Sequence, residues 1–263
     1  MIVDIHTHAY PDDISVKAIE NMERIFGLDS FCGGSIKELL SAMDKTGVDI
    51  SVLQGVALNP HQVISINTWM GSVQSKRIKC FAAMHPDLGG FADEIERIKE
   101  FGFWGVKFQP EFQDFTPDEE RMFPFYEKIN ELDLGVLFHT GFELSNPGVV
   151  HASPESILNV HKLFPEMKMI AGHFGGFMQW EEVEKYIVGT DVLLDTACVF
   201  GNLEDERIYK IIRSHGADKI LLGSDHPLFS SREAVEGIKK LGFTKDEESL
   251  MLGKNALRLF GKE

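Results

Sequence analysis

Short hydrophobic runs rich in valine, isoleucine and leucine recur along the whole chain, and longer segments with helical periodicity separate them. The eight runs lie at residues 2–8, 50–56, 78–85, 104–110, 135–141, 167–173, 191–197 and 219–226. Strands that alternate with helices predict parallel β/α units. Eight such units in 263 residues predict one domain, spanning 1–263, folded as a (β/α)8 TIM barrel. An open, doubly wound sheet is the alternative.

Helix start signals precede several of the segments between these runs. Each signal pairs an N-capping Ser or Thr with a Glu three residues later, or with a Pro at the first helical position. The signals are Ser35 with Glu38, Thr116 with Pro117, Ser153 with Pro154, and Thr244 with Glu247. The segment 9–34 is longer than one connection needs, and we expect it to cover the mouth of the barrel.

The amino-acid composition limits the partners and the cellular compartment that we expect for the protein. A net charge of −15 argues against nucleic acid or an anionic membrane as a partner, because both require a basic surface. Cys32, Cys80 and Cys198 are widely spaced and form no CxxC pair, which predicts free thiols in a reducing compartment. The N-terminus lacks a signal-peptide pattern, and no run has the length of a membrane span, so we expect a cytoplasmic protein.

Polar side chains close the first hydrophobic run. Residues i and i+2 share a face of a strand, so Asp4, His6 and His8 are expected to point the same way. His6 and His8 would then reach one metal ion at the barrel mouth. Asp4, one step deeper, would orient one of these histidines by hydrogen bonding.

Three later runs also end in a metal-ligand type of residue, at His139, His173 and Asp225. Catalytic groups of such barrels come from the C-terminal ends of the strands, which meet at one rim. The combined set of imidazole and carboxylate groups fits a divalent ion such as zinc. A cluster of polar residues without a metal is the alternative.

Other polar residues have more open roles. Lys107 faces the predicted interior, where it would bind a substrate carboxylate, bridge two metals if carboxylated, or pair with a nearby carboxylate. His85 ends the third run and would touch substrate. His61, His161 and His215 lie on helices or helix ends and are expected to face solvent.

With these residues assembled, the chain resembles the amidohydrolase superfamily. Within it, the chain is similar to the amidohydrolase-2 branch, which includes aminocarboxymuconate-semialdehyde decarboxylase and related enzymes. The resemblance covers nearly the whole chain. Its motifs, in order, are DIHTH, GVKFQP, LFHTG, AGHFGG, LLGSDHP and MLGKNALRLFG.

The resemblance implies roles for these residues. The positions that match metal ligands are His6, His8, His139 and Asp225. Asp225 also matches the residue that takes a proton from water, and His173 matches the histidine that polarises substrate, acts as a base or holds a second metal. Lys107 occupies the place of the carboxylated lysine of two-metal members. One metal is usual in this branch, so we expect one divalent ion, with zinc as the first candidate and a second metal as the alternative.

Hydrolysis of an amide, ester or lactone of a small molecule by a metal-activated water is the first functional hypothesis. The second is non-oxidative decarboxylation of a small carboxylic acid. At 263 residues the chain is shorter than the well-known decarboxylases of the branch, which favours hydrolysis. A barrel that binds metal without catalysis is the third hypothesis, and a homodimer is implied by the resemblance alone.

Overall fold

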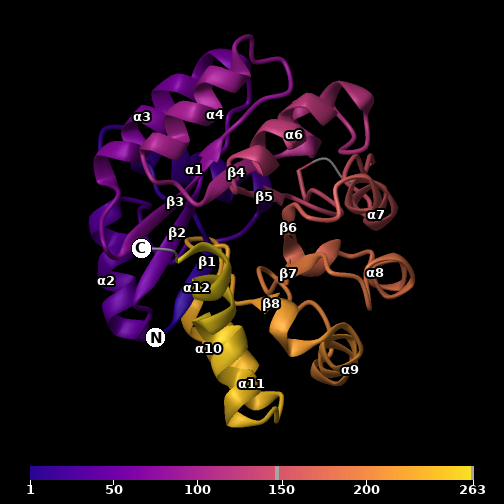
Figure 1. Ribbon diagram of the computed structural model, residues 1–263. Coiled ribbons are helices and arrows are strands. Elements are labelled where there is room, and N and C mark those ends of the chain that lie inside the picture. Colours follow the sequence, from indigo (N-terminus) through magenta and orange to yellow (C-terminus); the bar gives the residue numbers. More distant parts are fainter. Residues whose placement is uncertain (146–147, 262–263) are drawn as a thin grey trace.

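Eight parallel strands form a single sheet in sequential order in the computed structural model, which describes residues 1–145 and 148–261. Helices surround this sheet (Figure 1). The strands are β1 (Val3–Thr7), β2 (Ile50–Gln54), β3 (Ile78–Ala83), β4 (Gly105–Phe108), β5 (Gly135–Phe138), β6 (Lys168–Ala171), β7 (Leu193–Asp195) and β8 (Ile220–Leu221). Each lies within one of the hydrophobic runs identified from the sequence.

Backbone hydrogen bonds between β1 and the segment that follows β8 close the sheet into a barrel. The amide of Ile5 donates to the carbonyl of Leu222 at 2.7 Å, and the amide of Asp225 donates to the carbonyl of His6 at 2.8 Å. The predicted (β/α)8 barrel is therefore confirmed.

Most of the connecting segments contain a helix that packs outside the strands. The α-helices are α1 (Ser15–Phe26), α2 (Ile36–Thr46), α3 (Val63–Val73), α4 (Phe91–Glu100), α5 (Pro110–Gln113), α6 (Phe123–Glu131), α7 (Pro154–Leu163), α8 (Trp180–Tyr186), α9 (Asp205–His215), α10 (Ser231–Lys240), α11 (Lys245–Ser249) and α12 (Asn255–Phe260). Shorter turns of helix lie at Pro60–Gln62, Glu120–Met122, His173–Gly175, Ala217–Lys219 and Leu250–Lys254. Within the described residues, no helix is long and apolar enough to cross a membrane.

Three of the four predicted helix starts are confirmed. Ser35 and Thr244 form capping boxes, and the Ser153 side chain accepts a hydrogen bond from the amide of Ser156. The start at Thr116 is wrong, because the next α-helix, α6, begins only at Phe123. A helix begun at Pro117 would carry Pro124 in its interior, where proline removes a hydrogen bond and clashes with the preceding turn.

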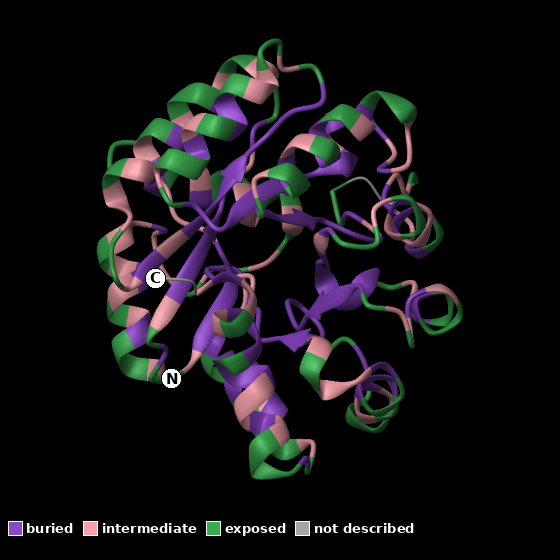
Figure 2. Ribbon diagram, in the orientation of Figure 1, coloured by how far each residue is buried: buried purple, intermediate pink, exposed green. Residues whose placement is uncertain are grey.

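Two hydrophobic clusters lie on the two faces of the sheet, one between the strands and the helices and one inside the barrel. Nearly all strand residues are therefore buried (Figure 2). The strands contribute Val3, Ile5, Val52, Phe81, Leu137, Ile170, Leu193 and Leu221 to the cluster inside the barrel. Phe260 of α12 joins this cluster and packs on Phe81 and Trp104, with ring centroids 5.4 and 5.8 Å away. A Cβ atom at Gly135 would lie 2.6 Å from the Phe260 ring, so glycine makes room for it.

His215, at the end of α9, is buried rather than exposed, which corrects the expectation from the sequence. Its Nε2 donates to the carbonyl of Val192 at 2.8 Å, and the amide of Gly189 donates to its Nδ1 at 3.3 Å. The imidazole thus satisfies backbone groups of the loop that leads into β7. His61 is exposed as expected, and His161 is half-buried.

The buried imidazole of His215 predicts a loss of stability in acid. Burial, with the nearby Lys219 charge, lowers the pKa of His215 to about 4. The unfolded chain binds a proton here below pH ~6.5, so stability is complete above that pH and falls as pH drops towards 4. Between pH 7 and 4 the wild type should lose about 3 kcal/mol more than His215→Gln. Urea unfolding across this range, with His61→Gln as the exposed control, measures the difference. Equal slopes for wild type and His215→Gln would contradict it.

Candidate metal centre

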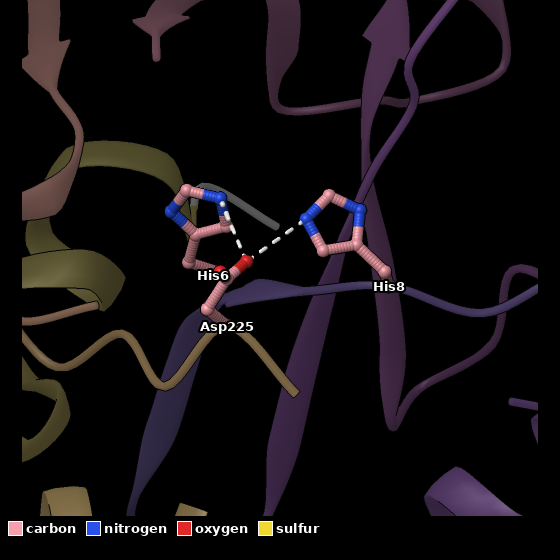
Figure 3. Close-up of side chains that lie close together, drawn as sticks. All are labelled: His6, His8 and Asp225. Atoms are coloured by element: carbon pink, nitrogen blue, oxygen red, sulfur yellow. Dashed lines mark ion pairs between the residues drawn. The ribbon is translucent and has the colours of Figure 1, made fainter. Parts of the chain in front are cut away.

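The closure of the barrel brings His6, His8 and Asp225 together at the end of β1 and just after β8 (Figure 3). Oδ1 of Asp225 lies 3.2 Å from Nε2 of His8 and 3.6 Å from Nε2 of His6. One ligand atom from each residue lies within 4.8 Å of the others. This spacing would allow one divalent ion to contact all three.

The remaining predicted histidines continue this group around the rim. His173 follows β6, and its ring centroid lies 4.9 Å from that of His6. His139 follows β5, and its ring centroid lies 4.5 Å from that of His173. His139 thus adjoins the three-residue group through His173. The four-ligand set of His6, His8, His139 and Asp225 stays a prediction.

The donor atoms at this rim fit a divalent cation. Nε2 of His139 is buried and has no hydrogen-bond partner, which is costly for a polar atom. Burial lowers the pKa of His6, of His139 and, to about 3, of His173, so these imidazoles are neutral, the form that binds metal. Their nitrogens and a carboxylate oxygen form a ligand set typical of zinc and related ions.

Asp225 is held as a carboxylate. Burial alone would raise its pKa, but the hydrogen bond from His8 and the neighbouring His6 and His173 keep that pKa well below the usual value. Its backbone has a φ of 66°, in the left-handed region that non-glycine residues seldom adopt. The thiol of Cys198 donates to Oδ2 at 3.2 Å, so both oxygens of Asp225 are engaged.

Asp195, at the end of β7, orients His6. Its Oδ2 accepts a hydrogen bond from Nδ1 of His6 at 2.8 Å, and its Oδ1 accepts from the backbone amides of His173 and Ala197. With its Nδ1 proton committed to Asp195, neutral His6 presents an unprotonated Nε2 towards the Asp225 carboxylate. Because this nitrogen and the carboxylate oxygen are both hydrogen-bond acceptors, a cation between them would stabilise their approach. Asp195 was not among the residues expected from the sequence, although it closes a hydrophobic run just as the predicted residues do.

Asp4 does not have the orienting role expected from the sequence. Its carboxylate accepts hydrogen bonds from the side chains of Ser224 and Ser231 and from the backbone amide of His6. Burial raises its pKa to about 6, against the opposing effect of these hydrogen bonds. The pairing of β1 with β2 shifts register between Asp4 and Thr7, so the simple alternation of faces fails there.

Lys107 is buried on β4, level with Leu137 of the interior cluster. In the described part of the chain, no carboxylate lies within ion-pair distance of its ammonium group, so the simple ion-pair alternative is not found. Burial lowers its pKa to about 8, and the more distant Asp195 and Asp225 oppose this shift.

Glu143 is a further buried carboxyl at the rim that sequence reasoning missed, because nothing in a loop sequence indicates burial. Its Oε2 lies 3.8 Å from Nε2 of His139 and accepts a hydrogen bond from Gln109 at 3.2 Å. Burial raises its pKa to about 7. His85, predicted to touch substrate, is buried, and its Nδ1 accepts a hydrogen bond from the amide of Asp87.

A family model described as Amidohydrolase matches residues 3–262 of this chain. Among curated proteins, no significant match to the sequence is found. Many solved structures share the fold.

Three of these structures illustrate the range of enzymes that share the fold. A 5-carboxyvanillate decarboxylase from Sphingomonas paucimobilis superposes with a TM-score of 0.73 at 16% identity, covering 100% of this chain and 99% of the other. A dihydroxybenzoic acid decarboxylase from Polaromonas sp., with bound manganese and the inhibitor 2-nitroresorcinol, gives 0.74 at 18%, covering 99% and 96%. A probable 2-pyrone-4,6-dicarboxylic acid hydrolase from Acinetobacter baumannii, with bound citric acid, gives 0.70 at 17%, covering 99% of both chains. At these identities the likeness shows the fold alone.

The hydrogen bond from His6 to Asp195 predicts a metal-binding phenotype for Asp195→Asn. The amide is nearly isosteric but cannot hold the Nδ1 proton of His6 as a carboxylate does, so affinity for Zn²⁺ or Mn²⁺ should fall about 10–100-fold. Competition against a chromophoric chelator measures this affinity. Asp4→Asn, at an equally buried carboxyl, serves as the control and should stay within a few-fold of wild type. Similar losses in both variants would refute the orienting role.

Proposed function

The chain belongs to the amidohydrolase family, in its amidohydrolase-2 branch, and on that premise we propose that it is a metal-dependent decarboxylase of a small carboxylic acid. Hydrolysis was the first hypothesis from the sequence. The decarboxylases among the structures that share its fold over nearly their whole length now favour the second hypothesis. The reaction would release CO₂ without an oxidant.

The observation that carries the substrate class in this proposal is the buried ammonium of Lys107 in the barrel interior. A buried cation without a close counter-ion is costly, and a carboxylate of the substrate would offset that cost. The substrates named for the three similar structures are all carboxylic acids, which is consistent with an anionic substrate here.

The residues of the rim can carry out the proton transfer that decarboxylation needs. The bond between the carboxylate and its carbon breaks, CO₂ leaves, and the electron pair left on the carbon takes one proton. We propose that this proton comes from solvent water and passes to the carbon through Asp225 and His173, whose ligand atoms lie within 4.8 Å of each other. A divalent ion held by His6, His8, His139 and Asp225 would supply positive charge that stabilises the developing anion. Lys107 would hold a second anionic group of the substrate.

Hydrolysis remains the second candidate, because one similar structure is a probable hydrolase of a pyrone dicarboxylic acid. In that reaction Asp225 would accept a proton from water, and His173 would stabilise the developing oxyanion. Both reactions take a small carboxylic acid and one divalent ion, for which zinc and manganese are the candidates. A second metal on a carboxylated Lys107, and a homodimer, stay predictions.

Product analysis separates the two reactions. The metal-loaded protein would be incubated with carboxyl-labelled 2,6-dihydroxybenzoate and 5-carboxyvanillate, and with 2-pyrone-4,6-dicarboxylate as the hydrolysable substrate. Decarboxylation releases labelled CO₂ in a one-to-one ratio with substrate lost. A ring-opened product without release of CO₂ would contradict decarboxylation and support hydrolysis.

Removal of the Lys107 charge should weaken substrate binding. Lys107→Met keeps the length of the side chain and removes a charge-assisted contact worth about 2–3 kcal/mol, so KM should rise roughly 30-fold or more. Steady-state kinetics on the substrate found above measures the change, with Lys79→Met on β3 as a control outside the site. An unchanged KM in Lys107→Met would show that Lys107 does not contribute to substrate binding.

A further inference from the structure

A second group of potential metal ligands lies beside the first and contains a cysteine. His173, Cys198 and Asp225 follow β6, β7 and β8, and each offers a ligand atom within 4.8 Å of the other two. Sγ of Cys198 lies 3.2 Å from Oδ2 of Asp225. From the sequence, Cys198 was expected to be only a free thiol, and it forms no disulfide.

The imidazole of His173 is the independent sign of a ligand here. The residue is only 5% exposed, and within the described residues no hydrogen bond to the protein is found for either ring nitrogen. Its backbone amide is bonded to Asp195, but that bond leaves the ring unsatisfied. A largely buried imidazole that makes no hydrogen bond to the protein is available to bind a cation.

We propose that His173, Cys198 and Asp225 form a second cation site that shares Asp225 with the first. The two oxygens of Asp225 divide between the sites, because Oδ1 faces His6 and His8 whereas Oδ2 faces Cys198. Asp225 would therefore bridge two ions. This site shares His173 with the second metal implied by the family resemblance, but its other ligands are Cys198 and Asp225 in place of a carboxylated Lys107.

The sulfur ligand sets the class of cation. A thiolate with an imidazole and a carboxylate favours Zn²⁺, Co²⁺ or Cd²⁺ over Mn²⁺ or Mg²⁺. Binding replaces the proton on Cys198 by the cation, and one proton leaves to solvent. An ion here would also occupy His173 and Asp225, so an excess of Zn²⁺ should inhibit the enzyme; this consequence alone rests on the proposed function.

Cobalt titration tests the site without any substrate. Co²⁺ added to the metal-free full chain should produce a near-ultraviolet thiolate-to-cobalt absorption band whose full intensity corresponds to one thiolate-bound Co²⁺ per chain, within a total of two bound equivalents. The band should be lost in Cys198→Ser, which should also bind one equivalent fewer. Cys32→Ser is the matched control, because Cys32 lies outside this group, and it should keep the band in full. Circular dichroism checks that both variants fold.

Cobalt K-edge absorption of the wild type provides a second measurement that needs no variant. It should detect a sulfur ligand at about 2.3 Å, by analogy with zinc–thiolate bonds. No absorption band with a several-fold excess of Co²⁺, a band that persists unchanged in Cys198→Ser, or an absence of sulfur from the cobalt environment would each overturn the proposal.

Discussion

The hydrogen bonds that join β1 to the segment after β8 are the interaction on which the candidate site depends. They bring His6 and His8, near one end of the chain, beside Asp225, near the other, and the bond from the amide of Asp225 to the carbonyl of His6 fixes their separation. The left-handed backbone at Asp225, and also at His173 and Cys198, then directs three side chains to one place just beyond the strand ends. The pairing that closes the barrel therefore also sets the geometry of the proposed metal sites.

Charged groups buried at this rim reduce the stability of the fold. Asp195 and Asp225 are ionised while largely removed from water, and burial holds His6, His139 and His173 neutral next to them. Lys107 places a cation in the same interior. The hydrogen bonds of Asp195 compensate one carboxylate, whereas Nε2 of His139 remains unpaired. Because a bound cation would satisfy this nitrogen, metal affinity and fold stability should be linked.

Much of the fold and part of the site follow from the sequence, because each rests on a local signal. Hydrophobic runs mark buried parallel strands, and His6, His139, His173 and Asp225 are recognisable because each ends such a run. The orienting role was assigned to Asp4 rather than Asp195 because a register shift in β1 leaves no mark in the sequence. The burial of Glu143 and His215, and the contact of Cys198 with Asp225, arise from tertiary packing between distant segments, which no local pattern encodes.

The position of α12 has a consequence for the way the chain is made. Phe260 packs against Phe81 and Trp104 at the end of the barrel where the strands begin. Helix α12 also contacts both β1 and β8. During synthesis, therefore, strands that have already left the ribosome can pair with their neighbours but cannot complete their inner core. We therefore expect their apolar inner face to stay exposed to water until residues 250–260 emerge.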